Sequence, residues 1–141
     1  MSDIKVVSNK KEFEIAYKIR VKVFVEEQKV PLEMELDEED KIATHIILYE
    51  NDKPIGCGRI IFNDKIAKMG RIAVLKEKRK KGYGEKICKE LINIAKEHKI
   101  KEIKIHAQCS AIGFYKKLGF TTCSAEFYEA GIKHIEMMRK I

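Results

Sequence analysis

The stretch of sequence that decides the fold is Arg71-Ile72-Ala73-Val74-Leu75-Lys76-Glu77-Lys78-Arg79-Lys80-Lys81-Gly82-Tyr83-Gly84. It begins with β formers, continues into a basic turn, and leads into a segment whose apolar residues recur at helical spacing: Ile87, Leu91, Ile94 and Ala95. A helix N-terminus presents unpaired N–H groups and a partial positive charge, and glycine lets an anion approach the backbone. This order therefore predicts a phosphate site at Arg79, Lys80, Lys81, Gly82, Tyr83 and Gly84.

Two other phosphate-binding motifs do not fit this stretch. A P-loop needs the pattern G-x-x-x-x-G-K-[ST], which is absent. A dinucleotide fingerprint needs a third glycine at position 87, where the chain has Ile87. The remaining alternative is a charged, solvated loop in which the glycines only serve a turn.

The rest of the chain alternates between strand-like and helical segments. Runs of β formers predict strands at residues 4–7, 44–49, 55–62, 66–75 and 103–108, and a final pair within 120–138 that turns at 129–131. Helical spacing predicts a helix that starts after Ser8 or Asn9 and stops before Pro31. A second helix follows Gly84 and ends near residues 98–99, and a short third helix is capped by Ser110 and closed by Gly119. The acidic segment 29–43 is expected to be a loop with room for a helical turn.

This order of elements predicts an α+β, or mixed α/β, fold in which a single domain spans residues 1–141. The strands at 44–49, 55–62 and 66–75 form an antiparallel meander. The helix after Gly84 allows the strand at 103–108 to pair in parallel with the end of the meander, through a right-handed crossover. Gly56 and Gly58 indicate a bulge or a close backbone approach in the middle strand.

Composition narrows the classes of function. Of the 141 residues, 45% are apolar and 36% are charged, which is typical of a globular chain. Apolar runs reach only about four residues, too short for a membrane span. The net charge of +7 is compatible with a polyanionic ligand, but no aromatic-rich basic surface or helix-turn-helix pattern is found, so no nucleic-acid or membrane partner is expected. The four cysteines form no C-x-x-C pair and no secretory signal is seen, so we expect mostly buried, reduced thiols, no metal site and a cytoplasmic location.

Two motifs together resemble the GNAT acyl-CoA N-acyltransferase superfamily. Arg79-x-x-Gly82-x-Gly84 matches its R/Q-x-x-G-x-G/A motif, at the usual distance after the strand at 71–74. Phe114-Tyr115-Lys116-Lys117-Leu118-Gly119-Phe120 resembles its Y-x-x-x-G-F signature. The resemblance covers essentially the whole chain, and residues 20–28, the acidic loop and residues 129–134 look like the ElaA-like branch of small bacterial members. It implies a central, mostly antiparallel sheet that is splayed between two strands and flanked by about four helices.

The resemblance also implies an acetyl-CoA-dependent N-acetyltransferase, in which a primary amine attacks the thioester directly in a ternary complex. The amides of residues 79–84 would bind the pyrophosphate of coenzyme A. Free backbone groups of Ile72, Ala73 and Val74 would pair with the pantetheine arm, and one of these N–H groups would stabilise the oxyanion. Further residues implied to line the coenzyme groove are Gln108, where the family often has Asn, and Ser110, Ala111 and Phe114.

Acid–base chemistry is less determined than coenzyme binding. Tyr115 matches the family position of the general acid, whereas on its residues alone it also fits an amphipathic core tyrosine. The candidates for the general base are His134, His45, Glu27, Glu33 and Glu35, unless the amine binds already neutral.

The sequence also leaves the identity of the acceptor substrate undetermined. The acidic run at 33–40 is either a recruiting surface for a cationic amine or a solvated loop. We expect a small-molecule or peptide amine as acceptor, and dimers are common in the family. A non-catalytic acyl-CoA-binding or sensor module is the alternative function on the same fold.

Overall fold

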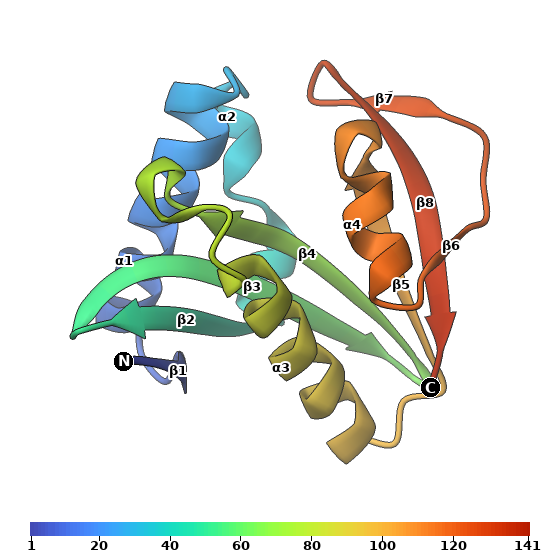
Figure 1. The fold of residues 1–141 in the computed structure, drawn as a ribbon, viewed down its shortest axis with the longest axis horizontal. Helices are drawn as coiled ribbons and strands as arrows, with labels where there is room; N and C mark the ends of the chain where they lie inside the picture. The colour runs from blue at the N-terminus through green and yellow to red at the C-terminus, as the bar shows by residue number, and fades with distance from the viewer.

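The chain builds one mixed sheet with helices on both sides (Figure 1). The computed structural model describes all 141 residues. The strands are β1 Ser2–Val6, β2 Thr44–Glu50, β3 Lys53–Asn63, β4 Ile66–Val74, β5 Glu102–Gln108, β6 Thr121–Thr122, β7 Phe127–Glu129 and β8 Ile132–Lys140. The α-helices are α1 Lys10–Arg20, α2 Leu32–Glu35, α3 Tyr83–Glu97 and α4 Ile112–Lys117. The strand order is β1-β2-β3-β4-β5-β8-β6, with β7 paired to β8, so the predicted mixed α/β fold is confirmed.

The sheet opens between β4 and β5, as the resemblance implied. These strands are parallel neighbours, but only Ile66–Met69 of β4 lie opposite β5. β4 then bulges: its register against β3 shifts between Cys57 and Arg59, and Arg71 takes a left-handed φ of 52°. Beyond the bulge, β4 remains paired with β3 while its other edge no longer pairs with β5. The result is a free strand edge at the mouth of the opening.

The two strand glycines allow α3 to lie close to the sheet. A Cβ atom at Gly56 would lie 2.8 Å from the Ile87 side chain, and one at Gly58 would lie 2.9 Å from it. The bulge in β4 falls opposite Gly58. The predicted close approach is therefore confirmed at both glycines, and β3 has a bulge next to Gly56, where its register against β2 shifts between Leu48 and Tyr49.

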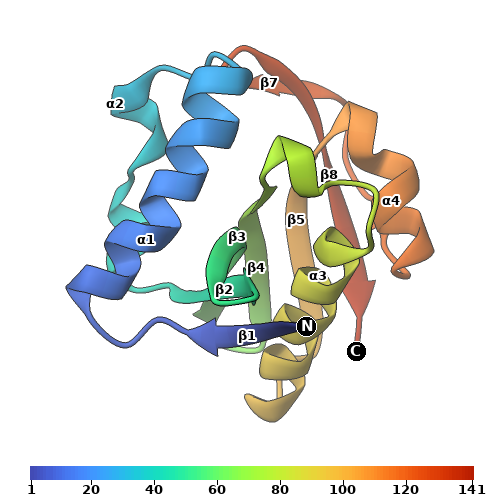
Figure 2. The same cartoon turned by 60° about the vertical axis from the view of Figure 1, so that its left-hand side comes forward.

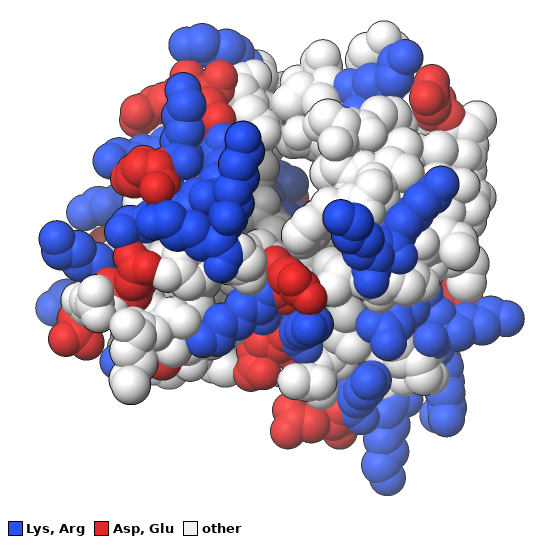
Figure 3. Space-filling model, in the orientation of Figure 1, with Lys and Arg blue, Asp and Glu red and all other residues white.

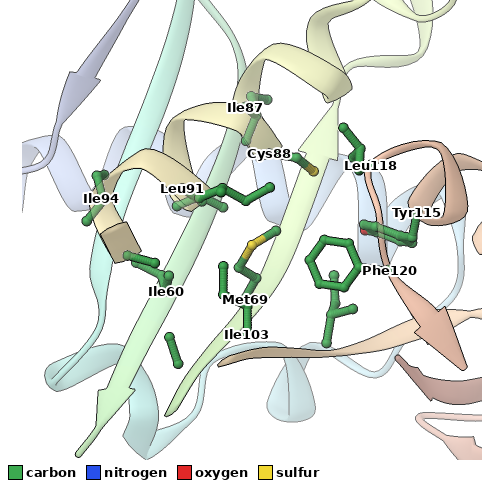
Figure 4. Packing of buried hydrophobic residues seen from close by; sticks show 14 of the residues in the cluster. Ile60, Met69, Ile87, Cys88, Leu91, Ile94, Ile103, Tyr115, Leu118 and Phe120 are labelled. Carbon is green, nitrogen blue, oxygen red and sulfur yellow. The ribbon is translucent and has the colours of Figure 1, made fainter. Parts of the chain in front are cut away.

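Helices on opposite faces of the sheet frame the opening. Figure 2 shows α1 and α2 on one face and α3 and α4 on the other. The main core lies between the sheet and α3 and extends to α4 (Figure 4). Its buried members include Ile60, Met69, Ile87, Leu91, Ile103, Tyr115 and Phe120. This core holds α3 beside β4 and α4 beside β5, on the two sides of the opening.

Two helix predictions need correction. Asn9 caps α1 as expected, by accepting a 2.8 Å hydrogen bond from the Glu12 amide, but Val21–Glu27 form a π-helix instead of more α-helix. Because a π-turn only adds a residue to the turn, regular apolar spacing does not reveal it. Ser110 does not cap the third helix, because it lies inside a 3₁₀ turn. The residue at the N-cap of α4 is Ala111, whose side chain makes no capping hydrogen bond.

The predicted turns and the acidic segment agree better with the structure. Gly119 closes α4 with a φ of 89°. Ala130 and Gly131 form the two-residue turn between β7 and β8, with φ of 53° and 77°, as a hairpin turn with two positive φ angles requires. The acidic segment contains α2 and a 3₁₀ turn at Glu38–Lys41, which extends the helical turn that was allowed there.

Expectations from composition have mixed outcomes. Cys57 and Cys88 are buried, but Cys109 is half-buried and Cys123 is exposed, so the thiols are not mostly buried. All four are free thiols. None of the helices has the length and apolar character needed to cross a bilayer.

Candidate active site

A cavity of about 530 Å³ lies at the opening between β4 and β5. One wall comes from β3, β4 and the segment around α2, and the other from β5, α4 and the β7–β8 hairpin. The residues of the predicted site that line it are Ile72, Val74, Arg79, Gln108, Ala111, Tyr115 and His134. A cavity of this size suits a small-molecule site. The structure thus brings the free strand edge, the candidate acid and one candidate base to the same space.

The basic turn between β4 and α3 offers unused amides. The N–H groups of Lys80, Lys81 and Gly82 make no backbone hydrogen bond, and those of Tyr83 and Gly84 lie in the first turn of α3, where no intrahelical acceptor exists. Gly82 has a φ of 84°, which favours glycine. Figure 3 shows Lys and Arg side chains gathered over this turn beside a hollow in the surface. The turn therefore presents several N–H groups to an anion at the start of a 15-residue helix.

The side chains of Arg79 and Tyr83 have protein partners. Arg79 donates two hydrogen bonds to Glu27, at 2.5 and 2.6 Å, and its Nε donates to the Val74 carbonyl at 2.9 Å. These bonds to Arg79 lower the pKa of Glu27. The Tyr83 hydroxyl donates to Glu50. The Arg79 amide also donates to the Lys76 carbonyl, at 3.4 Å, so the prediction that it binds phosphate is wrong and only residues 80–84 keep free amides. Tyr83 is available to an anion through its backbone, and Arg79 fastens the basic turn to the π-helix.

The backbone of β4 presents an open N–H at Val74. The Leu75 amide donates to the Ile55 carbonyl at 2.9 Å, on the β3 side. Because successive backbone groups of a strand point to opposite edges, the N–H of Val74 faces the opening. Ile72 lines the cavity as well, whereas Ala73 is 3% exposed, lies opposite Cys57 and does not line it. Of the three predicted strand residues, two therefore reach the cavity.

Tyr115 combines a core position with an accessible hydroxyl. Its ring packs edge-on against Phe114 and Phe120, and Figure 4 shows it beside Phe120 in the core. The hydroxyl has no hydrogen-bond partner in the protein. It is not fully buried either, because Arg59 Nε is the only fully buried side-chain polar atom without a partner. The Tyr115 hydroxyl therefore opens onto the cavity that this residue lines. Burial raises the pKa of Tyr115 far above its ordinary value, so the phenol stays protonated.

His134 has the hydrogen bonds of an oriented base. Its Nδ1 lies 2.7 Å from the Ile132 carbonyl, which assigns the proton of the neutral ring to Nδ1 and leaves a lone pair on Nε2. Nε2 lies 3.9 Å from a Glu129 carboxylate oxygen, and Glu129 also contacts His106 at 3.0 Å. His134 can therefore accept a proton at Nε2, with a carboxylate close enough to stabilise the imidazolium.

The other predicted groove residues divide into two groups. Gln108 donates a 2.8 Å hydrogen bond to Gln28, which follows the π-helix, so this pair bridges the opening. Ala111 lines the cavity, but Ser110 and Phe114 do not. Phe114 instead packs over the start of α3, where a Cβ atom at Gly84 would lie 3.4 Å from its ring. Phe114 therefore borders the basic turn.

The four remaining base candidates are less suitable than His134. His45 Nε2 contacts the Asp40 carbonyl at 3.0 Å outside the cavity, and burial lowers its pKa. Glu33 does not line the cavity, and Glu27 is paired with Arg79. Glu35 lines the cavity but accepts a 2.6 Å hydrogen bond from buried Arg20. His134 is thus the candidate with an unengaged basic atom at the cavity.

Three acids of the acidic run form ion pairs with buried arginines. Asp37 and Asp40 each accept a 2.7 Å hydrogen bond from Arg59 Nη1, and Asp40 also binds Arg20 at 2.7 Å. Burial opposes ionisation of Asp40, but its hydrogen bonds from Arg20, the Asp37 amide and Arg59 outweigh burial and lower its pKa. These acids are counter-ions that let two arginines, 1% and 4% exposed, lie under α2. The solvated-loop interpretation is therefore wrong for Glu35, Asp37 and Asp40, whereas Glu33 and Glu38 are exposed as it predicts. Recruitment of a cationic amine by the run stays a prediction.

Substituting Arg20 by Met should destabilise the fold by about 3–5 kcal/mol, since it leaves Glu35 and Asp40 buried without this partner. Urea unfolding measures the change, with exposed Lys22→Met as a control expected to stay within about 0.5 kcal/mol. Because the pKa of Asp40 is lowered, its contribution is present above the ordinary value of 3.8 and is lost as the pH falls below it. This acid sensitivity should weaken in Arg20→Met, and an unchanged free energy of unfolding would contradict the role of Arg20.

Sequence reasoning missed Gln28 and Glu129. Glu129 could have been found from the hairpin: Phe127 lies opposite His134, so residue 129, two positions on, shares the face of His134. Gln28 had no such signal, because its position depends on the π-helix. Arg59 was also missed, since a charged residue in a strand gives no sign that distant carboxylates will cover it.

Comparisons with known proteins agree with this geometry. The family model for the acetyltransferase (GNAT) domain matches residues 8–141. The uncharacterized N-acetyltransferase YjcF of Bacillus subtilis is 39% identical over 135 residues, covering 95% of this chain and 96% of YjcF. The crystal structure of Escherichia coli ElaA superimposes with a TM-score of 0.88 at 24% identity, covering 99% of each chain, so the expected fold of the ElaA-like branch is confirmed. A GNAT family acetyltransferase from Elizabethkingia anophelis, solved with acetyl-CoA bound, has a TM-score of 0.77 at 18% identity, covering 99% of this chain and 98% of that one.

Proposed function

The chain belongs to the GNAT acetyltransferase family, and from this premise we propose that it transfers the acetyl group of acetyl-CoA to a primary amine by direct attack in a ternary complex. The observation that carries the proposal is the cavity at the opening between β4 and β5, with the Tyr115 hydroxyl and His134 on its walls. One domain, residues 1–141, would supply the whole site. Coenzyme binding is supported as well, because Arg79 lines the cavity and the unused amides of residues 80–84 follow it in the same turn.

The coenzyme would bind from the basic turn inward. The amides of residues 80–84 would hold the diphosphate, aided by the charges of Lys80 and Lys81, and Phe114 would border that groove. The pantetheine arm would then follow the free edge of β4, where Val74 N–H is unpaired. The relative from Elizabethkingia anophelis, which has acetyl-CoA bound, supports this choice of cosubstrate.

Two side chains would manage the protons of the transfer. The amine nitrogen forms a bond to the thioester carbon as the carbon–sulfur bond breaks, and His134 Nε2 accepts the proton that the amine loses. Tyr115 donates its hydroxyl proton to the departing sulfur, a transfer that its position at the cavity allows. The N–H of Val74 is the group best placed among residues 72–74 to stabilise the oxyanion.

The test is an acetyl-transfer assay with the full chain. Acetyl-CoA and a panel of small amines and peptides are supplied, and release of the free thiol is followed. We expect amine-dependent release, with initial-rate lines that intersect when both substrates are varied, as a ternary complex requires. Binding of acetyl-CoA without any release would favour the non-catalytic acyl-CoA-binding module instead, and parallel lines would contradict direct attack.

Substituting His134 by Gln should lower kcat by about 10²-fold, because the amide cannot accept the proton of the amine. The acceptor KM and the affinity for coenzyme A should change little. His98→Gln is the matched control, since His98 ends α3 and does not line the cavity. A kcat within twofold of wild type in His134→Gln would show that the amine reacts without this base.

A further inference from the structure

The end of the cavity farthest from the basic turn has features that the proposed chemistry does not use. We call it the acceptor end; it is lined by Met34, Glu35, Asp37, Glu39, Arg59, Ile61, Lys68 and Arg71. Strand register explains why its cations meet. In the β3–β4 pair, Arg59 lies opposite Gly70 and Ile61 lies opposite Lys68. Since alternate residues share a face, Arg59 and Lys68 lie on the face opposite to buried Ile60 and Met69.

The acids of the acceptor end are already engaged. Glu35 accepts from Arg20 at 2.6 Å, Asp37 accepts from Arg59 at 2.7 Å, and Glu39 lies 3.5 Å from Arg59. Each of these three carboxylates therefore lies within 3.5 Å of an arginine nitrogen. A cationic group of an acceptor would have to compete with these arginines for the carboxylates.

Its cations, in contrast, keep unused donors. Lys68 forms no ion pair or hydrogen bond, although it lines the cavity. Arg71 uses Nε and Nη2 for contacts with Glu35 and Asp37, which leaves Nη1 without a partner. Arg59 is 4% exposed, and its Nε is the only buried side-chain polar atom in the protein without a hydrogen bond. Because this Nε is closed off from the cavity, the donors that a ligand can reach are those of Lys68 and Arg71.

We infer that the acceptor is a small amine that carries an anionic group, a carboxylate or a phosphate, bound at the acceptor end by Lys68 and Arg71. This inference rests on the proposed function, of which it specifies the substrate class. An anion satisfies donors that the protein leaves free, whereas a neutral or cationic amine leaves them unpaired. The amine would then extend toward His134 on the opposite wall, and the 530 Å³ that it shares with the acetyl-bearing arm limits it to a small molecule.

The experiment compares three-carbon and two-carbon amines that differ in charge. β-Alanine and O-phosphoethanolamine are the anionic probes, ethanolamine is the neutral one, and 1,3-diaminopropane is the cationic one. Turnover with acetyl-CoA gives kcat/KM for each, and calorimetry with the protein saturated with coenzyme A gives binding without turnover. Lys68→Met removes the one unpaired ammonium group of the acceptor end. Lys104→Met is the control, because Lys104 is the register partner of Lys68 on β5 but does not line the cavity.

We expect at least one anionic amine to exceed ethanolamine and 1,3-diaminopropane about tenfold in kcat/KM or in affinity. Lys68→Met should remove most of that advantage, while Lys104→Met should keep it. A preference for β-alanine would indicate a carboxylate as the anionic group, and a preference for O-phosphoethanolamine would indicate a phosphate. Anion binding that depends on Lys68, without acetyl transfer, would support this subsite and defeat the proposed function. Three outcomes would overturn the inference. One is acetyl transfer with equal or greater preference for ethanolamine or 1,3-diaminopropane. The others are the absence of anion binding and an equal effect of both lysine variants.

Discussion

Gly82→Asp should abolish detectable binding of coenzyme A. Gly82 precedes α3 with a φ of 84°, and its amide belongs to the group that has no protein acceptor. An aspartate there would place a negative charge about 4 Å from the bound diphosphate, where repulsion of several kcal/mol is expected at an effective dielectric constant of about 20. Binding should therefore weaken by about 10³-fold or more, as isothermal titration calorimetry would measure.

Gly82→Asn separates this charge effect from strain and size. Asparagine has nearly the same shape as aspartate, tolerates a left-handed backbone, and is neutral. A Cβ atom at position 82 meets no atom within 4 Å, so neither variant should clash. We expect Gly82→Asn to keep most of the coenzyme affinity. If Gly82→Asp binds as well as Gly82→Asn, the diphosphate does not lie at this turn.

Tyr115→Phe should lower kcat by about 10³-fold and leave the affinity for coenzyme A within twofold. Only the hydroxyl is removed, and this hydroxyl has no partner in the protein, so the packing against Phe114 and Phe120 stays. The loss would reflect the missing proton for the departing sulfur. Single-turnover release of the thiol measures the chemical step, and calorimetry measures the affinity.

Tyr128→Phe is the matched control for this change. Tyr128 is 72% exposed on β7 and does not line the cavity, so removing its hydroxyl should leave kcat unaltered. An undiminished kcat in Tyr115→Phe would assign Tyr115 a purely structural role. A parallel loss of coenzyme affinity would instead mean that the hydroxyl binds the cosubstrate.

Much of the fold could be predicted because local patterns carry it. Alternation and turn residues placed the β2–β4 meander, Gly56 and Gly58 marked the bulge and the close approach of α3, and helical spacing after Gly84 gave α3. The Ala130-Gly131 turn fixed the final hairpin. The π-helix escaped prediction because its extra residue changes hydrogen bonding without an obvious change in the apolar pattern.

The candidate site was predictable where it depends on the backbone and less so where it depends on side-chain partners. A basic turn before a helix has the same free amides in any fold that contains it, and the turn at residues 80–84 follows that rule. The partners of Arg79 and Glu35 could not be deduced, since Glu27 and Arg20 reach them through tertiary packing. For the same reason, the acidic run gave no sign that it neutralises buried arginines.

The most direct test is an NMR titration of the ¹⁵N-labelled chain with coenzyme A. The amide signals of residues 80–84 and of Val74 should shift together and saturate at one ligand per chain. Amide signals of residues 80–84 and of Val74 that stay in place at saturating coenzyme A, while other signals shift, would contradict the account.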